Sequence, residues 1–275
     1  MGVLDDKVAI VTGSARGIGR ATAEILSEHG AKVLINDLDV TEAEQTAGEI
    51  PGETEVWGGD LTKSGAPEKL VQAAIEAWGK IDIIVNNAGY TLDGPVHKLS
   101  DDWWQRMLDI HVTVPFQVIR AAAPHLREPA KVERSEGREV FRKIVNVSST
   151  SGVFGKDGQA NYAAGKSAVV GLTKTVAKEW GQFKINCNAV AFGFIDTRLT
   201  ASKSEGNEID VDGTAVELGM TDVMRDRAAE AIPLGRPATP AEAAGGVFFL
   251  CSPWSNYVHG QVLNITGGIS GGMVS

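Results

Sequence analysis

The stretch Thr12-Gly-Ser-Ala-Arg-Gly-Ile-Gly19 decides the fold, because it stands between a strand-type run and a helix-type run. Residues 7–12 before it are rich in β-branched side chains. Residues 19–30 after it place apolar side chains at helical spacing and end on glycine. The glycines inside the stretch lack a Cβ, so the backbone there can turn tightly and approach a neighbouring group. A strand, a glycine-rich turn and a helix in this order indicate the start of a βαβ unit.

The same alternation continues along the rest of the chain. Further strands are predicted over residues 31–36, 54–57, 81–86, 140–147, 184–190 and 261–265, and further helices over 41–49, 66–78, 101–126, 161–180 and 240–250. Nearly continuous apolar strands separated by helices indicate a parallel sheet covered on both faces. Because such crossovers are right-handed, we predict one doubly wound, Rossmann-type α/β domain that spans residues 1–275.

The overall composition is that of an ordinary globular chain. Of its 275 residues, 43% are apolar and 22% are charged, and the net charge is -9. This negative charge argues against a nucleic-acid surface and against docking on an anionic membrane. No apolar run approaches a membrane span, and the N-terminal residues lack a signal-peptide pattern, so we expect a cytoplasmic protein. Cys187 and Cys251 lack metal-ligand spacing, so we expect no metal site.

Two segments break the alternation. Residues 128–139 are polar and highly charged, which predicts an exposed loop extension. Residues 200–232 have little strand character and contain several glycine and aspartate residues. Because long irregular segments in compact domains are often functional, we predict a substrate lid over 200–232, with a mobile surface loop as the alternative.

The glycine spacing in the opening stretch favours a dinucleotide. Glycines at positions 13, 17 and 19 allow the turn, the close approach of a diphosphate and the packing of helix on strand. The N–H groups at the start of the helix would face the phosphates. We therefore expect a phosphate-binding loop, rather than a tight turn alone, made of Gly13, Ser14, Arg16, Gly17, Ile18 and Gly19.

Asp37 at the end of the second predicted strand bears on which dinucleotide is bound. It follows Gly19 at nearly the roughly 20-residue spacing at which an acid accepts hydrogen bonds from the adenosine ribose. A carboxylate there would also repel a 2′-phosphate at short range, which favours NAD. Arg16 argues the other way, since a guanidinium beside the ribose can pair with a 2′-phosphate. We expect NAD as the cofactor and keep NADP as the alternative.

Tyr162 and Lys166 form the candidate catalytic pair, because residues one helical turn apart share a face. A free phenol, with a pKa of about 10, is a poor base at neutral pH, and a nearby ammonium lowers that pKa. The pair could then exchange a proton with a carbonyl or alcohol oxygen. Ser149, which follows the strand over 140–147, could hydrogen-bond the same oxygen. Such a pair is more often structural when it occurs alone.

Taken together, these motifs resemble the short-chain dehydrogenase/reductase family along nearly the whole chain. Its 3-oxoacyl-carrier-protein-reductase-like members are the most similar. The resemblance is carried by the glycine loop, by Ser149, and by Asp60-Leu61, Asn86-Asn-Ala-Gly89, Tyr162-Ala-Ala-Gly-Lys166 and Asn264-Ile-Thr-Gly-Gly268.

The resemblance implies further roles around the cofactor. Asp60 and Leu61 would hold the adenine, and Lys166 would also bond the nicotinamide ribose. The middle of the site would be lined by Asn87, Ala88 and Gly89. The nicotinamide carboxamide would be bound by Ile195 and Thr197. A homotetramer is also implied, with the long helices that begin near Asp101 and Asn161 at one interface, which requires exposed apolar faces on them.

Two positions depart from the family pattern. His111 stands where the family usually has an Asn that positions a water in the proton relay to the lysine. Because an imidazole titrates near neutral pH, His111 either joins this relay or is a packed structural histidine. Phe192 stands where the family usually has Pro, which could reshape the nicotinamide wall or the substrate pocket.

The predicted function is an NAD(H)-dependent oxidoreductase that interconverts a secondary alcohol and a ketone, with Tyr162 as general acid/base. The first alternative is an NADPH-dependent 3-oxoacyl thioester reductase. The second is a non-catalytic NAD-binding regulator, for which only His111 and Phe192 speak. The expected partner is a small alcohol or ketone. Its identity stays open, although apolar residues in and beside the lid indicate a partly apolar pocket.

Overall fold

One parallel sheet organises the molecule. In the computed structural model, which describes residues 2–211 and 214–269, seven strands lie in the order β3-β2-β1-β4-β5-β6-β9, each parallel to its neighbours. The strands are β1 (Val8–Thr12), β2 (Lys32–Asp37), β3 (Thr54–Gly58), β4 (Ile83–Asn86), β5 (Arg142–Ser149), β6 (Ile185–Phe192) and β9 (Val262–Ile265). The predicted doubly wound α/β fold is confirmed.

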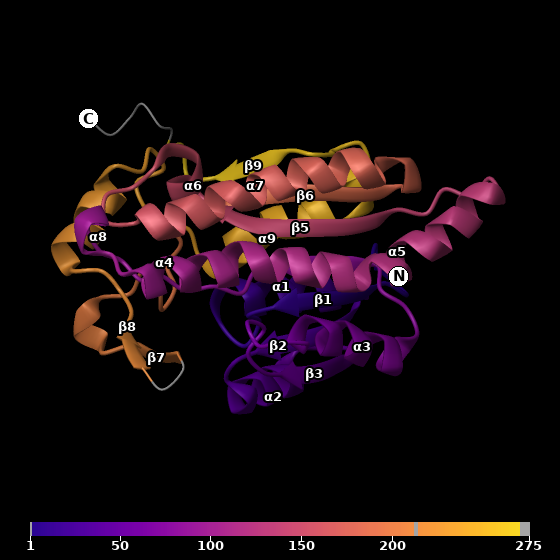
Figure 1. Cartoon of the computed structure of the whole chain (residues 1–275), viewed down its shortest axis with the longest axis horizontal. Coiled ribbons are helices and arrows are strands. Elements are labelled where there is room, and N and C mark those ends of the chain that lie inside the picture. Colours follow the sequence, from indigo (N-terminus) through magenta and orange to yellow (C-terminus); the bar gives the residue numbers. More distant parts are fainter. Residues whose placement is uncertain (1, 212–213, 270–275) are drawn as a thin grey trace.

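Helices cover both faces of this sheet, and Figure 1 looks onto the face covered by α5 and α7. In β1, Ala9 and Val11 join one hydrophobic cluster and Ile10 joins the other, as the two-residue period of a strand requires. The helices packed on the first cluster are α1 (Gly17–Glu28), α2 (Val40–Glu49) and α9 (Pro240–Cys251), and those on the second are α3 (Ala66–Trp78), α5 (Val114–Ser135) and α7 (Ala160–Trp180). No helix among the described residues is long and apolar enough to cross a membrane.

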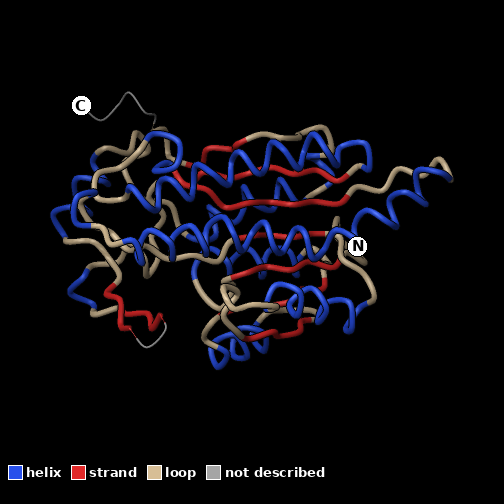
Figure 2. The backbone as a smooth tube through the Cα atoms, in the orientation of Figure 1, coloured by secondary structure: helices blue, strands red, loops and turns tan. Residues whose placement is uncertain are grey.

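The strand order reverses between β1 and β4, and this point positions the site. β1 pairs with β2 on one side and with β4 on the other, and Figure 2 shows these strands side by side. At such a switch point the loops that leave the carboxyl ends of the strands diverge and leave a crevice. Gly13 and residues 16–19 after β1, and residues 87–89 after β4, therefore line one cavity.

The loop predicted over residues 128–139 is wrong for residues 128–135, because helix α5 continues to Ser135, whereas residues 136–139 lie outside any helix or strand. Their charges are paired: Lys131 lies 2.6 Å from Glu128, and Arg142 of β5 lies 2.7 Å from Glu133. Ala130 is buried in the core, so this end of the helix still packs on the protein. High polarity had indicated a loop, whereas the helix continues with its charges neutralised in pairs. Figure 1 shows this end of α5 projecting past the sheet.

The single helix predicted over residues 101–126 is interrupted near His111. Helix α4 (Asp101–Leu108) passes into one π-helical turn over Asp109–Thr113, and α5 follows. A π-turn accommodates an extra residue in a helix and is frequent at functional sites. It brings the buried His111 side chain to the wall of the cavity.

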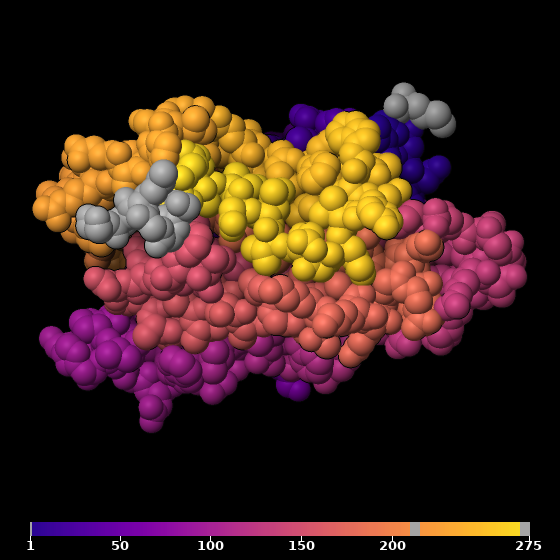
Figure 3. Space-filling view, turned by 90° about the horizontal axis from the view of Figure 1, so that it is seen from above, coloured from indigo at the N-terminus to yellow at the C-terminus, as the bar shows by residue number. Residues whose placement is uncertain are grey.

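Residues 200–232 lie at the end of the molecule where the strands have their carboxyl ends (Figures 1 and 3). The expectation of little strand character was wrong, since β7 (Glu208–Val211) and β8 (Thr214–Glu217) pair as an antiparallel hairpin, followed by α8 (Asp222–Glu230). Ile209 and Val216 of the hairpin pack against the cluster beneath α5 and α7. Strands this short carry too few apolar residues to show a two-residue period in the sequence.

Candidate active site

A cavity of about 1600 Å³ opens at the carboxyl ends of the strands. It is bordered by the glycine loop, by the loops after β2, β3, β4 and β5, and by residues from along the 200–232 segment. All but one of the residues predicted for the site line this cavity. They are Gly13, Arg16, Gly17, Ile18, Gly19, Asp37, Asp60, Leu61, Asn87, Ala88, Gly89, His111, Ser149, Tyr162, Lys166, Ile195 and Thr197.

The glycines of the loop stand at positions where a side chain would not fit, and their small size leaves room for a phosphate group. Gly13 and Gly17 adopt positive φ angles of 63° and 57°. A Cβ on Gly13 would lie 2.7 Å from the Cα of Ala88, and one on Gly19 would strike the carbonyl oxygen of Gly13. No side chain caps the start of α1, so its first N–H groups are open to an anion. These features fit the diphosphate of a dinucleotide.

Ser14 is the predicted site residue that does not line the cavity. It is completely buried, and its hydroxyl donates to the carbonyl oxygen of Val11 at 2.7 Å. The same hydroxyl accepts from the N–H of Asn36 at 3.1 Å. Ser14 therefore ties the loop to β1 and β2 from below, and its hydroxyl does not point into the cavity, so a cofactor contact by this residue stays a prediction.

Asn87 holds the glycine loop from the side of β4. Its amide group donates to the carbonyl oxygens of Thr12 and Gly13, both at 2.9 Å. The hydroxyl of Thr12 accepts from the N–H groups of Asn87 and Ala88, both at 3.0 Å. Although Asn87 lines the cavity, its side-chain donors are used to fix the loop that would receive the phosphates.

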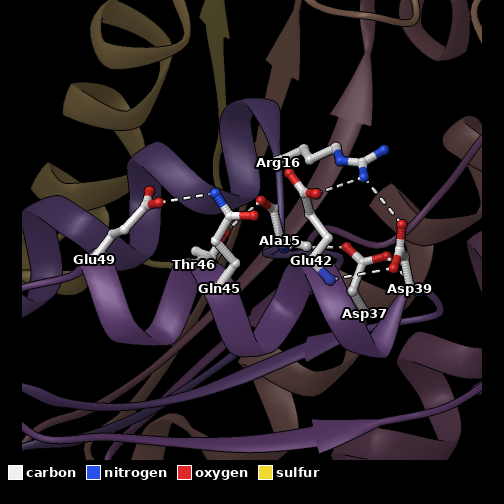
Figure 4. A network of polar contacts seen from close by, with 8 residues as sticks. All are labelled: Ala15, Arg16, Asp37, Asp39, Glu42, Gln45, Thr46 and Glu49. Atoms are coloured by element: carbon white, nitrogen blue, oxygen red, sulfur yellow. Dashed lines mark hydrogen bonds and ion pairs between the residues drawn. The ribbon is translucent and has the colours of Figure 1, made fainter.

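Acidic residues surround the end of the cavity near β2 (Figure 4). Asp37 accepts from the N–H groups of Ala15 at 3.1 Å and of Asp39 at 3.2 Å, which fixes its carboxylate at the rim. Arg16 forms ion pairs with Asp39 at 3.0 Å and with Glu42 at 2.8 Å. The hydrogen bond with Glu42 raises the pKa of Arg16. Two carboxylates thus already occupy the guanidinium that could have paired with a 2′-phosphate.

Asp60 and Leu61 close the same end from β3. The carboxylate of Asp60 accepts from the N–H and the hydroxyl of Thr62, at 2.8 Å and 2.7 Å. Leu61 is 3% exposed and belongs to the core beneath α3. The pair presents a fixed polar turn on an apolar floor, which suits a flat heterocyclic base.

Tyr162 and Lys166 lie at the opposite end of the cavity, both on α7. The ammonium nitrogen of Lys166 is 5.7 Å from the centre of the Tyr162 ring and donates to the carbonyl oxygen of Val147 at 2.7 Å. Burial lowers the pKa of Lys166 to about 7. Burial also raises the pKa of Tyr162 to about 12, which a hydrogen bond with Ser149 offsets only in part.

The expected lowering of the Tyr162 pKa by Lys166 is therefore not found. Lys166 is itself desolvated and carries only part of a charge at neutral pH. The charge of Asp93 further raises the pKa of Tyr162. With its pKa raised, Tyr162 is protonated at neutral pH. The sequence could not show this, because it gives the spacing of the pair and not its burial.

Ser149 ends β5 and begins the short helix α6 (Thr150–Phe154), which was not predicted. Its hydroxyl accepts from the N–H of Ser151 at 3.1 Å and hydrogen-bonds Tyr162. The capping bond fixes the Ser149 side chain, so the two hydroxyls meet in the cavity as the sequence predicted.

His111 lies behind Tyr162, with the two rings edge to face and their centres 4.9 Å apart. Its Nε2 donates to the carbonyl oxygen of Tyr90 at 2.8 Å, and its Nδ1 has no partner among the described residues. Burial, with Lys166 nearby, holds the pKa of His111 well below its usual 6.5. Of the two alternatives for His111, this favours a neutral, packed ring over a group that titrates in the relay, because the ring is buried beside a cationic group.

A polar chain beside Tyr162 escaped the sequence analysis. The hydroxyl of Ser151 donates to Gln159 at 2.8 Å, and Gln159 donates in turn to Asp93 at 2.9 Å. All three line the cavity. Gln159 lies three residues before Tyr162, but Asp93 lies in a loop whose position only the fold reveals.

Phe192 and the residues after it form another part of the cavity wall, and Thr197 lies beside Gly17 of the glycine loop. Phe192 continues β6 and pairs with Ile265, so the chain remains extended where the resembling family has Pro. A tight turn follows, in which the N–H of Thr197 donates to the hydroxyl of Thr200 at 3.0 Å and that hydroxyl donates to the carbonyl oxygen of Ile195. This turn leads into the 200–232 segment.

The fold and the cavity together define a dinucleotide-dependent oxidoreductase, and comparison with known proteins agrees. A family model described as enoyl-(acyl carrier protein) reductase matches residues 13–270. The chain belongs to the short-chain dehydrogenase/reductase family and is an NAD(P)-dependent oxidoreductase acting on CH–OH groups.

The curated relatives align over almost the whole chain. The 3-oxoacyl-[acyl-carrier-protein] reductase of Thermotoga maritima is 34% identical over 97% of this chain and 98% of its own. That of Aquifex aeolicus is 35% identical over the same shares. Among solved structures, the 3-ketoacyl-(acyl-carrier-protein) reductase from Brucella melitensis complexed with NADH is 30% identical. It matches with a TM-score of 0.83, covering 96% of this chain and 98% of that one.

Proposed function

We propose that this protein interconverts a secondary alcohol and a ketone with NAD(H), and that Tyr162 is the general acid/base. The observation that carries this proposal is the meeting of two hydroxyls, those of Ser149 and Tyr162, inside the cavity and one helical turn from a buried Lys166 ammonium. A carbonyl oxygen placed between the two hydroxyls would accept a hydrogen bond from each. The bound nicotinamide supplies or takes up the hydride.

The protein residues handle the proton. In the reducing direction Tyr162, protonated because burial raises its pKa to about 12, donates its O–H proton to the substrate oxygen. Ser149 holds that oxygen in line and stabilises the charge that develops on it. The opposite transfer, from alcohol to Tyr162, needs the phenolate form of Tyr162.

Lys166 and His111 take part in the relay that delivers a proton to Tyr162. The pKa of Lys166, lowered to about 7, lets it hold or release a proton at neutral pH. Neutral His111 donates through Nε2 to Tyr90, so its Nδ1 is a free acceptor in the buried wall. A water on Nδ1 would take the place of the one that the family's Asn positions. His111 thus acts by positioning water and not by titrating.

For the cofactor we propose NAD over NADP. Asp37 is held at the rim by two N–H groups, in the place where a carboxylate accepts ribose hydroxyls and repels a 2′-phosphate. Arg16 is paired with Asp39 and Glu42 and offers no open guanidinium to that phosphate. The related structure in complex with NADH supports the same choice.

For the substrate, the names of the relatives favour a 3-oxoacyl thioester. The segment 200–232, proposed as the substrate lid, contributes Ile209, Met220 and Arg227 to the cavity wall. Apolar side chains with one cation suit an acyl chain that ends in a polar carrier. A simple secondary alcohol or ketone remains the broader alternative.

We also propose that residues 1–275 work as one domain and that the protein is a homotetramer. The interface expected on the long helices has exposed apolar side chains, Trp103 and Trp104 of α4 and Phe116 of α5, which are 39%, 41% and 44% exposed. The cytoplasmic location expected from the sequence stays a prediction.

A turnover assay tests the proposed function. Purified protein is mixed with NADH or NADPH and with acetoacetyl-coenzyme A, a panel of simple ketones, or crotonyl-coenzyme A, which offers only a C=C bond. We expect carbonyl reduction, with kcat/KM at least about tenfold higher for NADH than for NADPH. NADH binding without turnover of any carbonyl would favour the non-catalytic alternative. Reduction of crotonyl-coenzyme A alone would overturn the carbonyl assignment.

A further inference from the structure

Arg198 is an arginine in the cavity wall that nothing in the site described so far uses. It follows Thr197 in the turn after β6, is half-buried and lines the cavity. Within residues 2–211 and 214–269 it has neither a hydrogen bond nor an ion pair. Burial lowers its pKa, and the nearest charged groups are Arg16, Asp37, Asp39 and Glu42. A desolvated guanidinium without an acceptor is costly unless a ligand supplies one.

The neighbouring carboxylates do not supply that acceptor. Asp37 is turned to the N–H groups of Ala15 and Asp39, and Asp39 and Glu42 are paired with Arg16. Arg198 and Arg16 also repel each other across this end of the cavity. Arg198 therefore faces open cavity, at a place where an anion would relieve both desolvation and repulsion.

Arg198 is held close to the glycine loop. The side chain of Thr197, its neighbour, lies 3.6 Å from the position that a Cβ on Gly17 would take. Gly17 begins α1, whose first N–H groups have no side-chain cap. Arg198 thus lines the cavity beside the start of α1, with its charge close to Arg16 and Asp37.

We propose that Arg198 binds the diphosphate of the nicotinamide dinucleotide together with the N–H groups of the glycine loop. This inference rests on the proposed use of the cavity for the cofactor. The diphosphate carries two negative charges, and a guanidinium can bond it through two N–H groups at once. The 2′-phosphate of NADP is the other anion of this cofactor class, but it would have to sit among Asp37, Asp39 and Glu42.

The same turn joins the cofactor to the lid. The carbonyl oxygen of Thr200 accepts from Arg225 of α8 at 2.6 Å, and Arg225 also pairs with Asp196 at 3.2 Å. A diphosphate bound by Arg198 would therefore hold the turn to which α8 is attached.

Direct binding tests the proposal without relying on turnover. Calorimetric titrations with NADH, NADPH and ADP-ribose, which has the diphosphate but no nicotinamide, are compared for wild type, Arg198→Ala and Arg198→Lys. The matched control is Lys203→Ala, which removes one charge from the same segment but lies outside the cavity and pairs with Glu217.

For Arg198→Ala we expect the Kd of all three ligands to rise by a similar factor, about 10- to 100-fold. Arg198→Lys should recover part of the loss, and Lys203→Ala should bind like wild type. An unchanged Kd in Arg198→Ala would overturn the proposal, and a loss confined to NADPH would assign Arg198 to the 2′-phosphate instead. If wild type bound no dinucleotide, the proposed function itself would fail, which is a separate result.

Discussion

The two ends of the cavity handle charge in opposite ways. At the end near β2, Arg16, Asp39 and Glu42 stay charged at the surface and are paired with one another (Figure 4). At the other end Tyr162 and Lys166 are buried. Burial raises the pKa of Tyr162 and lowers that of Lys166, which favours the uncharged form of both side chains. The first arrangement can discriminate between ligands by charge, whereas the second can move a proton. The difference shows that burial, and not residue type alone, separates recognition from chemistry in this site.

At the end of the cavity near β2, which we call the recognition end, the substitution Asp37→Ser should give the largest change in cofactor preference. Removing the carboxylate removes the ribose acceptor and the repulsion of a 2′-phosphate. We expect the ratio of kcat/KM for NADH to that for NADPH to fall about 10- to 100-fold. Glu44→Gln, a change to an exposed acid elsewhere on α2, is the matched control and should leave the ratio unchanged. An unaltered ratio in Asp37→Ser would show that this end does not select by charge.

His111 tests the buried end through the pH dependence of stability. The pKa of His111 is held well below 6.5 in the folded protein. As the pH falls below 6.5, His111 therefore binds a proton in the unfolded chain but not in the folded protein. Stability should fall with pH in this range by about 1.4 kcal/mol per pH unit from this group. Urea unfolding at pH 6.5 and pH 5 should show wild type losing about 2 kcal/mol more than His111→Asn. Equal losses would mean that His111 already titrates in the fold.

Ser14→Ala should give the smallest effect on cofactor binding, and it tests whether the Ser14 side chain belongs to the recognition end. The hydroxyl bonds Val11 and Asn36 beneath the loop and does not face the cavity. Its loss should lower the free energy of unfolding by about 1–3 kcal/mol and leave the Kd for NADH within about twofold. A large rise in that Kd with unchanged stability would return Ser14 to the cofactor site.

Most of the sheet could be predicted from the sequence, because parallel strands buried on both faces are continuous apolar runs and the glycine loop marks where they start. The end of α5 was missed for the opposite reason. Its charges are neutralised by partners such as Glu133 with Arg142, and Arg142 lies in another element. The β7–β8 hairpin and the π-turn at His111 depend on tertiary packing that no local pattern encodes.

The candidate site was predicted residue by residue where a motif names the residue, as for Tyr162 and Asp37. It was missed where the fold alone brings residues together, as for Asp93 and Arg198. The pKa of Tyr162 was misjudged because a sequence shows which charges are near and not how much water is excluded.

The measurement that tests the central claim most directly is turnover and NADH binding in Tyr162→Phe. The account predicts that kcat/KM falls by about 100-fold or more while the Kd for NADH stays within about twofold, because the ring remains and only the proton donor is lost. Tyr257→Phe, at a fully exposed tyrosine, is the matched control and should behave as wild type. Wild-type turnover in Tyr162→Phe would contradict the assignment of Tyr162 as the proton donor.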